Sequence, residues 1–337
     1  MNITENISLK NYNTFNVEAN AAYFVNLNSK ADFEELLEHK IYQQNSHYII
    51  GGGSNILFTK NFTGLVIHNN IRGIEILKET ENDVEVKFGA GEVWHNCVLF
   101  CINNGFGGIE NLSLIPGYIG AAPMQNIGAY GVELKDVFEN LTAINLNTGE
   151  EEHFNKAACN FGYRESIFKN KAKDQYLITN VTLKLQKQPK FNISYGAIEK
   201  TLEENRVAEL SIKAISDAVI QIRENKLPNP KVIGNAGSFF KNPVVNNEIA
   251  FNIKKDFPEM PNYPTADKTK IPAGWLIDQC GFKGKVVGQT GTYKNQALVL
   301  VNHGNATGEE IISFSKEIQA TVFKKFGIEL DREVNLV

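Results

Sequence analysis

The sequence predicts a mixed fold, part α/β and part α+β, in two or three domains, and three observations lead to this prediction. The chain has 337 residues, about twice the length of a typical single domain. Short apolar runs alternate with helical patterns over residues 1–70, whereas residues 84–88 alternate polar and apolar with a period of two. Two apolar stripes at helical spacing lie near residues 212–222 and 311–323.

The first seventy residues are predicted to form a small α/β unit. Its helix should begin after Ser29, whose hydroxyl can cap it, because Phe33, Leu36 and Leu37 follow at positions i, i+3 and i+4. Strands are expected at residues 22–27, 48–50 and 65–67. The second of these strands runs directly into a run of three glycines.

The rest of the chain continues to alternate strands and helices. Residues 94–103 are predicted to be helical, and residues 105–131 form a long segment rich in glycine, asparagine and proline. A loop of that length inside a compact domain is more often functional than idle. The remaining elements are strands at 141–146 and 175–185, a helix from about 210 to before Pro228, a helix between Gly308 and Gly327, and an irregular strand at 328–337.

Charge and hydropathy exclude several classes of function. The formal net charge of -4 provides no basic excess to neutralise phosphates, so no nucleic-acid partner is expected. The N-terminus MNITENISLK lacks the basic and apolar regions of a signal peptide. No apolar run approaches the ~20 residues needed to cross a membrane. We therefore expect a cytoplasmic protein with no membrane partner.

The four cysteines are expected to be reduced and mostly buried thiols. They form no C-x-x-C pair, and the six histidines show no H-x-x-H or H-E-x-x-H spacing, so no metal is expected. Reduced thiols fit a reducing compartment. The cysteines are Cys97, Cys101, Cys159 and Cys280.

A glycine-rich turn follows the predicted strand at 48–50. It consists of Gly51, Gly52, Gly53, Ser54 and Asn55. Glycine tolerates positive φ angles and lets a ligand approach the backbone, and successive N–H groups in such a turn form an anion-binding nest. The segment matches neither G-x-G-x-x-G nor the Walker A pattern. A tight structural turn without a ligand explains it equally well.

A second glycine-rich block strengthens the case for a ligand. It supplies Ile115, Pro116, Gly117, Gly120, Ala121, Ala122, Gln125, Asn126 and Gly128. Small residues remove side-chain bulk where a large group must lie against the backbone, and Gln125 and Asn126 can pair with the edge of a heterocycle. Two such loops suit a long ligand that bridges two domains, such as a flavin dinucleotide. Nucleotide binding needs no redox chemistry, so the activity stays open at this point.

Three polar residues come from distant stretches of the chain. Arg164 lies among aromatic residues in FGYRESIF, where it could clamp an anion or form an ordinary structural ion pair. Ser238 follows small residues and precedes two phenylalanines, but no G-x-S-x-G elbow surrounds it, so a hydrolase is not expected. Glu333, taken alone, indicates a solvated surface residue.

In this order, the motifs resemble those of the UDP-N-acetylenolpyruvoylglucosamine reductase (MurB) family of peptidoglycan synthesis. The resemblance extends from Asn13-Thr14-Phe15 to Glu333-Val334. It is carried by GGGSN, GAG, ENLSLIPG, QNIGAYG, FGYRESIF, KLPNPK, NAGSFFKNP, PAGWLIDQ and QALVLVN. So many blocks in one order outweigh the alternatives that each motif allows separately.

The resemblance implies a two-part FAD-binding domain of the vanillyl-alcohol-oxidase type, followed by a C-terminal α/β substrate-binding domain. On this basis, residues 1–69 with the tail 328–337 form the first FAD-binding subdomain, 70–208 the second, and 209–327 the substrate-binding domain. FAD is expected to bind without a covalent bond, and NADPH is expected to donate the hydride.

The implied reaction is the reduction of UDP-N-acetylglucosamine enolpyruvate to UDP-N-acetylmuramate. Hydride from the reduced flavin adds to the vinyl carbon remote from the carboxylate, and Arg164 is expected to stabilise the resulting enolate. Ser238 would protonate the adjacent carbon, with Glu333 assisting at the carboxylate or orienting the acid. A serine of ordinary pKa is a poor acid, so it must act on a strongly basic centre or relay a proton from water.

The resemblance also implies contacts to this small-molecule substrate. They are Tyr195, Arg223, Lys226, Asn242, Lys283 and Gln296. The basic residues would hold the UDP diphosphate, and Tyr195 resembles the tyrosine of the longer form of the family. Where some members have serines after the IPG turn, this chain has Ala121 and Ala122, so backbone N–H groups must bind any phosphate there. A monomer is expected.

Two other functions compete with this interpretation. One is a flavin oxidase of the same superfamily, although those enzymes often attach FAD through histidine and neither glycine-rich loop contains one. The other is a nucleotide-sugar sensor that binds its ligand without turnover. The colour of the purified protein distinguishes the flavoenzymes from the sensor, because a reductase or an oxidase with bound FAD is yellow.

Overall fold

The computed structural model describes residues 1–337, and the chain divides into two compact units. Unit 1 consists of Met1–Ile7, Ala21–Gly52 and Thr63–Glu224, and unit 2 consists of Ser8–Asn20, Gly53–Phe62 and Asn225–Val337. The chain therefore passes from one unit to the other inside the first glycine-rich turn. The division into two FAD-binding subdomains and a substrate-binding domain, which the family resemblance implies, stays a prediction.

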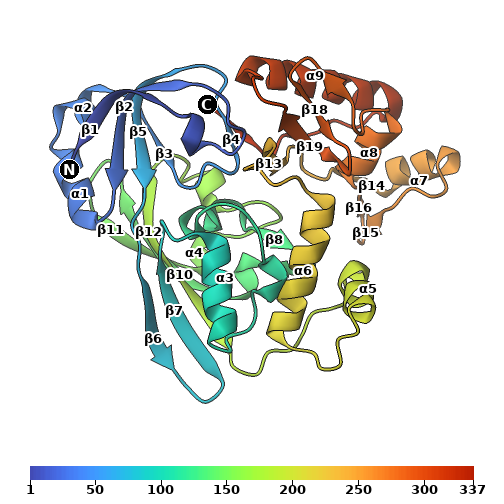
Figure 1. The fold of residues 1–337 in the computed structure, drawn as a ribbon, viewed down its shortest axis with the longest axis horizontal. Helices are drawn as coiled ribbons and strands as arrows, with labels where there is room; N and C mark the ends of the chain where they lie inside the picture. The colour runs from blue at the N-terminus through green and yellow to red at the C-terminus, as the bar shows by residue number, and fades with distance from the viewer. The chain divides into compact units, whose positions relative to one another are not determined.

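The first layer of unit 1 is a four-stranded sheet with two short helices (Figure 1). The strand order is β1-β2-β5-β3, and β3 runs parallel to β5. Ser29 caps α1 as predicted, because its Oγ accepts from the N–H of Asp32 at 3.1 Å and the Asp32 carboxylate accepts in return. The elements are β1 (Ile3–Ser8), β2 (Asn20–Leu27), α1 (Lys30–Leu37), α2 (Lys40–Gln44), β3 (His47–Ile50) and β5 (Phe62–Asn69).

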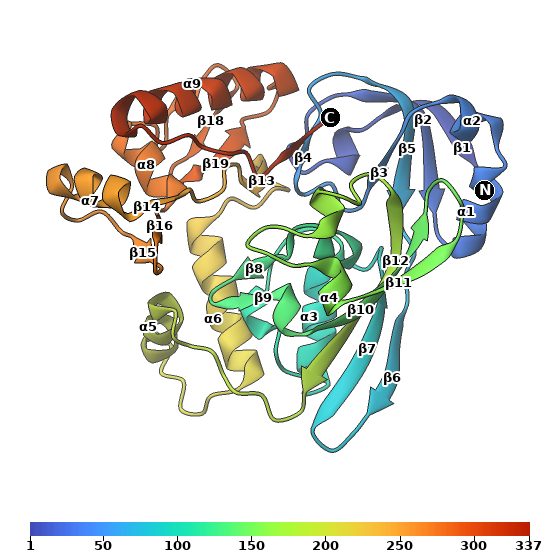
Figure 2. The same cartoon turned by 180° about the vertical axis from the view of Figure 1, so that it is seen from behind.

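The second layer of unit 1 is a five-stranded antiparallel sheet in the order β11-β10-β12-β7-β6. Helix α3 buries Trp94, Cys97, Val98 and Cys101 in one core with the sheet. Figure 2 shows β6 and β7 at one margin of the sheet, and every residue of β6 is exposed. The elements are β6 (Ile74–Glu79), β7 (Asp83–Gly89), α3 (Trp94–Asn103), β10 (Phe138–Asn145), β11 (Glu151–Asn155) and β12 (Tyr176–Gln186).

The long glycine-rich segment at 105–131 is irregular but well organised. It contains single 3-10 turns at Glu110–Leu112, Ile119–Ala121 and Pro123–Gln125. It ends in a small antiparallel ribbon of β8 (Gly128–Ala129) and β9 (Val132–Glu133). The segment that we expect to be functional therefore has a defined backbone conformation.

Two helices close unit 1 and form a separate small core. Ile198 and Leu202 of α5 pack with Ile215 and Val219 of α6, which confirms the apolar stripe predicted near residues 212–222. A third, one-turn helix follows β11. The bounds are α4 (Lys156–Cys159), α5 (Gly196–Glu204) and α6 (Ile212–Lys226).

Unit 2 combines a four-stranded sheet, β13-β19-β18-β17, with a three-stranded sheet, β14-β16-β15, and three helices. Its core joins Phe15 near the N-terminus with Phe239, Phe240 and Phe314. In addition, β20 (Asn335–Leu336) pairs in parallel with β4 (Ile56–Leu57). The other elements are β13 (Gly234–Ser238), β14 (Val244–Asn246), α7 (Asn247–Asp256), β15 (Tyr263–Pro264), β16 (Lys268–Lys270), α8 (Ala273–Gln279), β17 (Val286–Val287), β18 (Thr290–Tyr293), β19 (Gln296–Asn302) and α9 (Gly308–Phe326).

The cysteines are free thiols, as expected. Cys97, Cys101 and Cys159 are buried and Cys280 is partly buried. Burial raises the pKa of each thiol above its ordinary value, so these groups are poor nucleophiles at neutral pH. None of the helices combines the length and the apolar character that crossing a membrane requires.

Helix α9 begins with a capping box that can be tested. Thr307 Oγ1 accepts from the N–H of Glu310 at 3.2 Å, and the Glu310 carboxylate accepts from the N–H of Thr307 at 2.7 Å. We expect Thr307→Ala to lower the free energy of unfolding by about 1 kcal/mol, as measured by urea denaturation followed by circular dichroism. Thr321→Ala, the same change within α9, should cost less, because alanine favours the helix interior. Equal losses in both variants would contradict a specific capping role.

Candidate functional site

The two glycine-rich loops lie against each other in unit 1. A Cβ atom on Gly52 would lie 3.0 Å from Gly117 Cα and 3.0 Å from Tyr118 Cδ1, and one on Gly51 would lie 3.4 Å from Tyr118 Cβ. The absence of side chains at these positions thus permits close packing of the loops. Two segments that the sequence separates by about sixty residues are thus in direct contact.

Gly53 is required for a different reason and belongs to unit 2. Its φ angle is +61°, in the left-handed region, and a Cβ there would lie 2.0 Å from the carbonyl oxygen of Tyr12. The following Asn55 donates from Nδ2 to the carbonyl of Glu333 at 3.2 Å, and Asn335 N–H donates to the carbonyl of Asn55 at 3.1 Å. Asn55 thereby ties the glycine turn to the C-terminal tail.

The start of α3 holds the beginning of the second loop and the residues just before it. Trp94 donates its amide to the carbonyl of Gly117 at 2.9 Å and its indole N–H to the carbonyl of Leu112 at 2.8 Å. Within the loop, the N–H groups of Ala121 and Ala122 donate to Tyr118 and Ile119 at 3.1 and 3.0 Å. These two amides are therefore engaged in the 3-10 turn, and their expected contact to a phosphate stays a prediction.

Asn126 has a structural role in this conformation. It is fully buried, its φ angle is +44°, and its Nδ2 donates to Glu133 Oε2 at 3.1 Å and to the carbonyl of Gly162 at 3.0 Å. Its Oδ1 accepts from the N–H of Lys135 at 3.0 Å. The side-chain amide of Asn126, which was expected to pair with a heterocycle, is thus hydrogen-bonded within the protein. Gln125 is partly exposed.

Arg164 is fixed by the same loop. Its backbone is left-handed, with φ at +55°, and its guanidinium donates from Nη2 to the carbonyl of Gly128 at 2.5 Å. A Cβ on Gly128 would lie 3.1 Å from Arg164 Nη1, so a glycine there gives the guanidinium room to approach. The guanidinium also lies 5.6 Å from the ring centre of Tyr163.

The segments that carry the predicted residues Ser238 and Glu333 lie side by side in unit 2. Ser238 ends β13, after Gly237 at φ +68° and a bulge in the pairing with β19. The next residue, Phe239, accepts from the N–H of Glu333 at 2.9 Å. The tail and the strand then run antiparallel through a bridge between Phe240 and Arg332. Both residues are partly buried, and the Ser238 hydroxyl makes no hydrogen bond within the protein.

A tyrosine pair and an arginine gather around the second loop in unit 1. Tyr195 precedes α5 and meets Tyr130 edge to face, with ring centres 5.4 Å apart. The Tyr130 hydroxyl faces the guanidinium of Arg223, and burial lowers the pKa of that arginine while Tyr130 opposes the shift. Tyr130 lies within the motif QNIGAYG, but no spacing in the sequence relates it to Tyr195 or Arg223, so sequence reasoning gives it no role.

The other predicted substrate residues lie in unit 2. Asn242 Oδ1 accepts from the N–H of Ala273 at 2.9 Å, at the start of α8. Gln296 lies beside Gly274, the residue after Ala273: a Cβ atom on Gly274 would be 2.6 Å from Gln296 Oε1. Lys226 is exposed at the end of α6, and Lys283 pairs with Asp278 at 3.5 Å.

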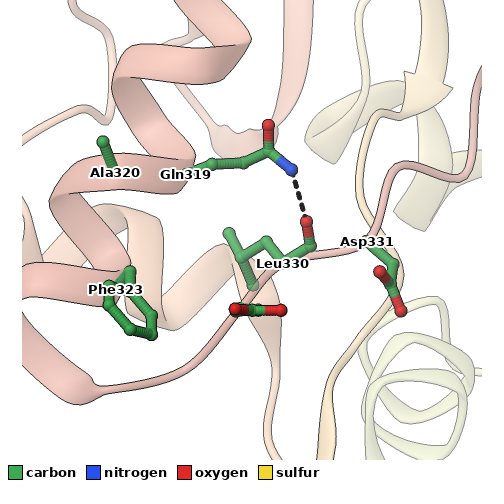
Figure 3. A pocket seen from close by; sticks show the side chains of 6 residues that line it. Gln319, Ala320, Phe323, Leu330 and Asp331 are labelled. Atoms are coloured by element: carbon green, nitrogen blue, oxygen red, sulfur yellow. Dashed lines mark hydrogen bonds between the residues drawn. The ribbon is translucent and has the colours of Figure 1, made fainter.

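Unit 2 also has a surface depression of about 330 Å³, shown in Figure 3. Gln319 spans it, with Nε2 donating to the carbonyl of Leu330 at 2.6 Å and Oε1 accepting from Arg332 at 2.6 Å. Its amide is thus already paired within the protein. The depression contains none of the predicted site residues, since it is lined by Gln319, Ala320, Phe323, Glu329, Leu330 and Asp331.

Comparison with protein families and known proteins agrees with the motifs. Residues 21–155 match an FAD binding domain, and residues 228–337 match the C-terminal domain of UDP-N-acetylenolpyruvoylglucosamine reductase. The prediction of an FAD-binding part followed by a distinct C-terminal domain is thereby confirmed.

Full-length relatives carry the same name. The UDP-N-acetylenolpyruvoylglucosamine reductase of Flavobacterium johnsoniae is 52% identical, with 100% of each chain covered, and that of Chromobacterium violaceum is 46% identical over 97% of this chain and 96% of its own. The crystal structure of the Thermus caldophilus reductase has the same fold, with a TM-score of 0.70 and 23% identity over 100% of this chain and 99% of its own. The chain therefore belongs to the UDP-N-acetylenolpyruvoylglucosamine reductase family of oxidoreductases.

Proposed function

We propose that this protein uses FAD and NADPH to reduce UDP-N-acetylglucosamine enolpyruvate to UDP-N-acetylmuramate, a step of cell-wall precursor synthesis. Full-length identity of 52% to a reductase of that name supports the reaction. The structural observation that supports it most directly is the pairing of Glu333 with Phe239, the residue that follows Ser238. Two residues that reaction chemistry calls for, and that no local pattern relates, thus lie on adjacent segments of the chain, the end of β13 and the C-terminal tail.

The contact between the two glycine loops supports the place proposed for the cofactor. When bound, FAD would accept hydride from NADPH and deliver it to the substrate. Gly51 and Gly52 let the first loop pack against Gly117 and Tyr118, and Gly120 packs against Ala90, so we propose that backbone N–H groups of the two adjoining loops hold the cofactor diphosphate. Neither loop contains a histidine, so we propose non-covalent binding.

Arg164 would stabilise the negative charge that develops on the enolate of the substrate carboxylate. A guanidinium is charged at any physiological pH and matches a carboxylate with two parallel N–H groups. Its bond to the Gly128 carbonyl orients the guanidinium before the substrate arrives. Fixed charge of this kind needs no reorganisation in the transition state, which is where it contributes most.

Ser238 would donate the proton to the carbon next to the carboxylate. Its hydroxyl has no competing partner in the protein, and the left-handed Gly237 sets the turn that presents it. Glu333 would orient this donor or assist at the carboxylate, because strand pairing fixes its backbone opposite Phe239. A serine is a weak acid, so protonation of a strongly basic carbon, or relay from water, is the role that suits it.

The remaining polar residues would bind the nucleotide part of the substrate. Arg223, Lys226 and Lys283 supply positive charge for a diphosphate, and Asn242 and Gln296 supply amides for neutral groups. Tyr195 is 45% exposed beside its contact with Tyr130, so part of its side chain is accessible to a ligand. We also propose that the protein works as a monomer in the cytoplasm, where its unpaired thiols would stay reduced.

The proposed activity has a direct test in two half-reactions. Purified protein should be yellow with bound FAD, and NADPH should bleach the flavin absorbance under anaerobic conditions. Adding the enolpyruvyl substrate to the reduced protein should then restore the absorbance and form UDP-N-acetylmuramate in equal amount. Colourless protein that FAD cannot reconstitute would exclude both flavoenzyme interpretations. Reduced protein that only oxygen reoxidises would favour an oxidase.

Replacement of Ser238 by alanine separates proton donation from hydride transfer. We expect Ser238→Ala to leave flavin reduction by NADPH intact and to lower the rate of product formation by at least ~100-fold, the usual contribution of a positioned general acid. Stopped-flow absorbance of each half-reaction measures the two steps. Ser313→Ala, on the exposed side of α9, is the matched control and should behave as the wild type. Wild-type turnover in Ser238→Ala would remove this serine from the mechanism.

Gly52 tests the contact between the two loops. Alanine there must push against Gly117 and Tyr118, and overpacking of about 1–3 kcal/mol predicts an FAD dissociation constant raised roughly 5- to 160-fold if the whole strain is relieved in the apoprotein. Gly196→Ala has open space around the new Cβ and no positive φ, so it should keep wild-type affinity. Titration of the apoprotein with FAD, followed by flavin fluorescence, compares the two. Unchanged affinity in Gly52→Ala would place the cofactor elsewhere.

A further inference from the structure

We propose that His95 is a positioning residue for Arg223, acting through the peptide of Leu114. The inference rests on the substrate-binding role proposed for Arg223. It concerns three residues that are distant in the sequence. His95 lies in the first turn of α3, Leu114 lies just before the second glycine-rich loop, and Arg223 lies in the last turns of α6. All of them lie in unit 1.

Leu114 has a backbone conformation that needs outside support. Its φ angle is +58°, and the left-handed region costs a non-glycine residue roughly 1–2 kcal/mol. Two hydrogen bonds hold the residue from opposite sides. Its N–H donates to His95 Nδ1 at 3.0 Å, and its carbonyl accepts from Arg223 Nε at 3.3 Å. The histidine and the arginine thus share one peptide turn.

The surroundings make this turn a rigid link. Trp94, next to His95, fixes the loop before and after the turn through Leu112 and Gly117. On the α6 side, the hydroxyls of Ser113 and Ser216 lie 2.7 Å apart, both buried. Leu114 is therefore the point where α3 and α6 meet the loop, and His95 supplies the acceptor at that point.

The hydrogen bond defines the protonation state that His95 must have. Because Nδ1 accepts the Leu114 N–H, the single proton of the neutral ring lies on Nε2. Burial, together with the charge of Arg223, lowers the pKa of His95 below its ordinary value. The neutral ring is thus the form present at neutral pH, and it is the form that can hold the turn.

The consequence for Arg223 is a restricted side chain. Its Nε is bound to Leu114, which leaves the two terminal nitrogens for Tyr130 and for a ligand. Tyr130 in turn contacts Tyr195. If Leu114 relaxed to an ordinary backbone conformation, its carbonyl would turn away and Arg223 would regain rotamers. Substrate would then have to order the guanidinium when it binds.

The test compares two substitutions that differ in one acceptor. In His95→Asn the side-chain oxygen can take the place of Nδ1, whereas His95→Leu keeps the bulk and has no acceptor. Loss of one positioning bond of about 1.4 kcal/mol predicts a KM for the enolpyruvyl substrate about tenfold higher in His95→Leu. Under saturating substrate, kcat should change little, and His95→Asn should recover most of the wild-type KM. Equal KM values in His95→Leu and wild type, or no recovery in His95→Asn, would overturn the proposal.

A double-mutant cycle shows whether the effect passes through Arg223. Lysine at position 223 lacks an Nε donor in that geometry, so Arg223→Lys should raise KM by itself, and adding His95→Leu should raise it little further. Fully additive effects would overturn the proposal, because they would mean that His95 acts independently. If His95→Leu fails to retain FAD, His95→Gln replaces it, since its oxygen reaches past the Nδ1 position.

The wild-type protein separates this inference from the proposed function. Reduced wild type that the enolpyruvyl substrate cannot reoxidise would refute the reaction itself. In that case the role of His95 is tested by binding alone, through the dissociation constant of UDP-N-acetylglucosamine measured by perturbation of the flavin spectrum. His95→Leu should bind this nucleotide sugar more weakly than His95→Asn and the wild type do. Any other order of affinities overturns the role of His95.

Discussion

The loop from Leu112 to Gly120 depends on the hydrogen bonds that the start of α3 provides. Trp94 donates twice, to Leu112 and to Gly117, and the N–H of Gly120 donates to Ala90 at 2.9 Å. A buried carbonyl left without its donor costs about 1–3 kcal/mol, so the bonds act together to select one loop conformation. The entropy of ordering the loop is lost during folding. A ligand that binds there meets a surface already in place, which is the condition for tight binding to backbone groups.

Unit 2 achieves a comparable result through strand pairing. Glu333 sits opposite Phe239 only because the C-terminal tail adds to the end of β13, and Asn55 ties the tail to the first glycine turn. The bond between Glu333 and Phe239 joins backbone groups, so almost any side chains at these positions would allow it. The sequence of the tail therefore contains no sign of its neighbour, and Glu333 taken alone resembles a surface residue.

Local signals in the sequence predicted local structure well. Ser29 with the apolar spacing after it, and Gly308 to the left-handed Gly327 at φ +66°, defined α1 and α9 because caps and periodicity act within a few residues. Strand β6 was missed because all its residues are exposed. For the site, glycine content singled out both loops, and their role as a cofactor site stays a prediction. Sequence reasoning could not show that the side-chain amide of Asn126 is hydrogen-bonded within the protein, since an amide has the same chemistry in either role and only tertiary contacts decide.

The way Arg223 is held explains why a cation at this position would suit an anionic ligand. Its partners, the carbonyl of Leu114 and the hydroxyl of Tyr130, are neutral groups that orient the guanidinium without cancelling its charge. Burial has already removed part of its water, as the direction of its pKa shift indicates. A carboxylate or phosphate that arrives there meets a charge that was partly desolvated during folding, so more of the attraction appears as binding. A carboxylate from the protein in place of the Leu114 carbonyl would hold the side chain as firmly, but it would leave little charge for the substrate.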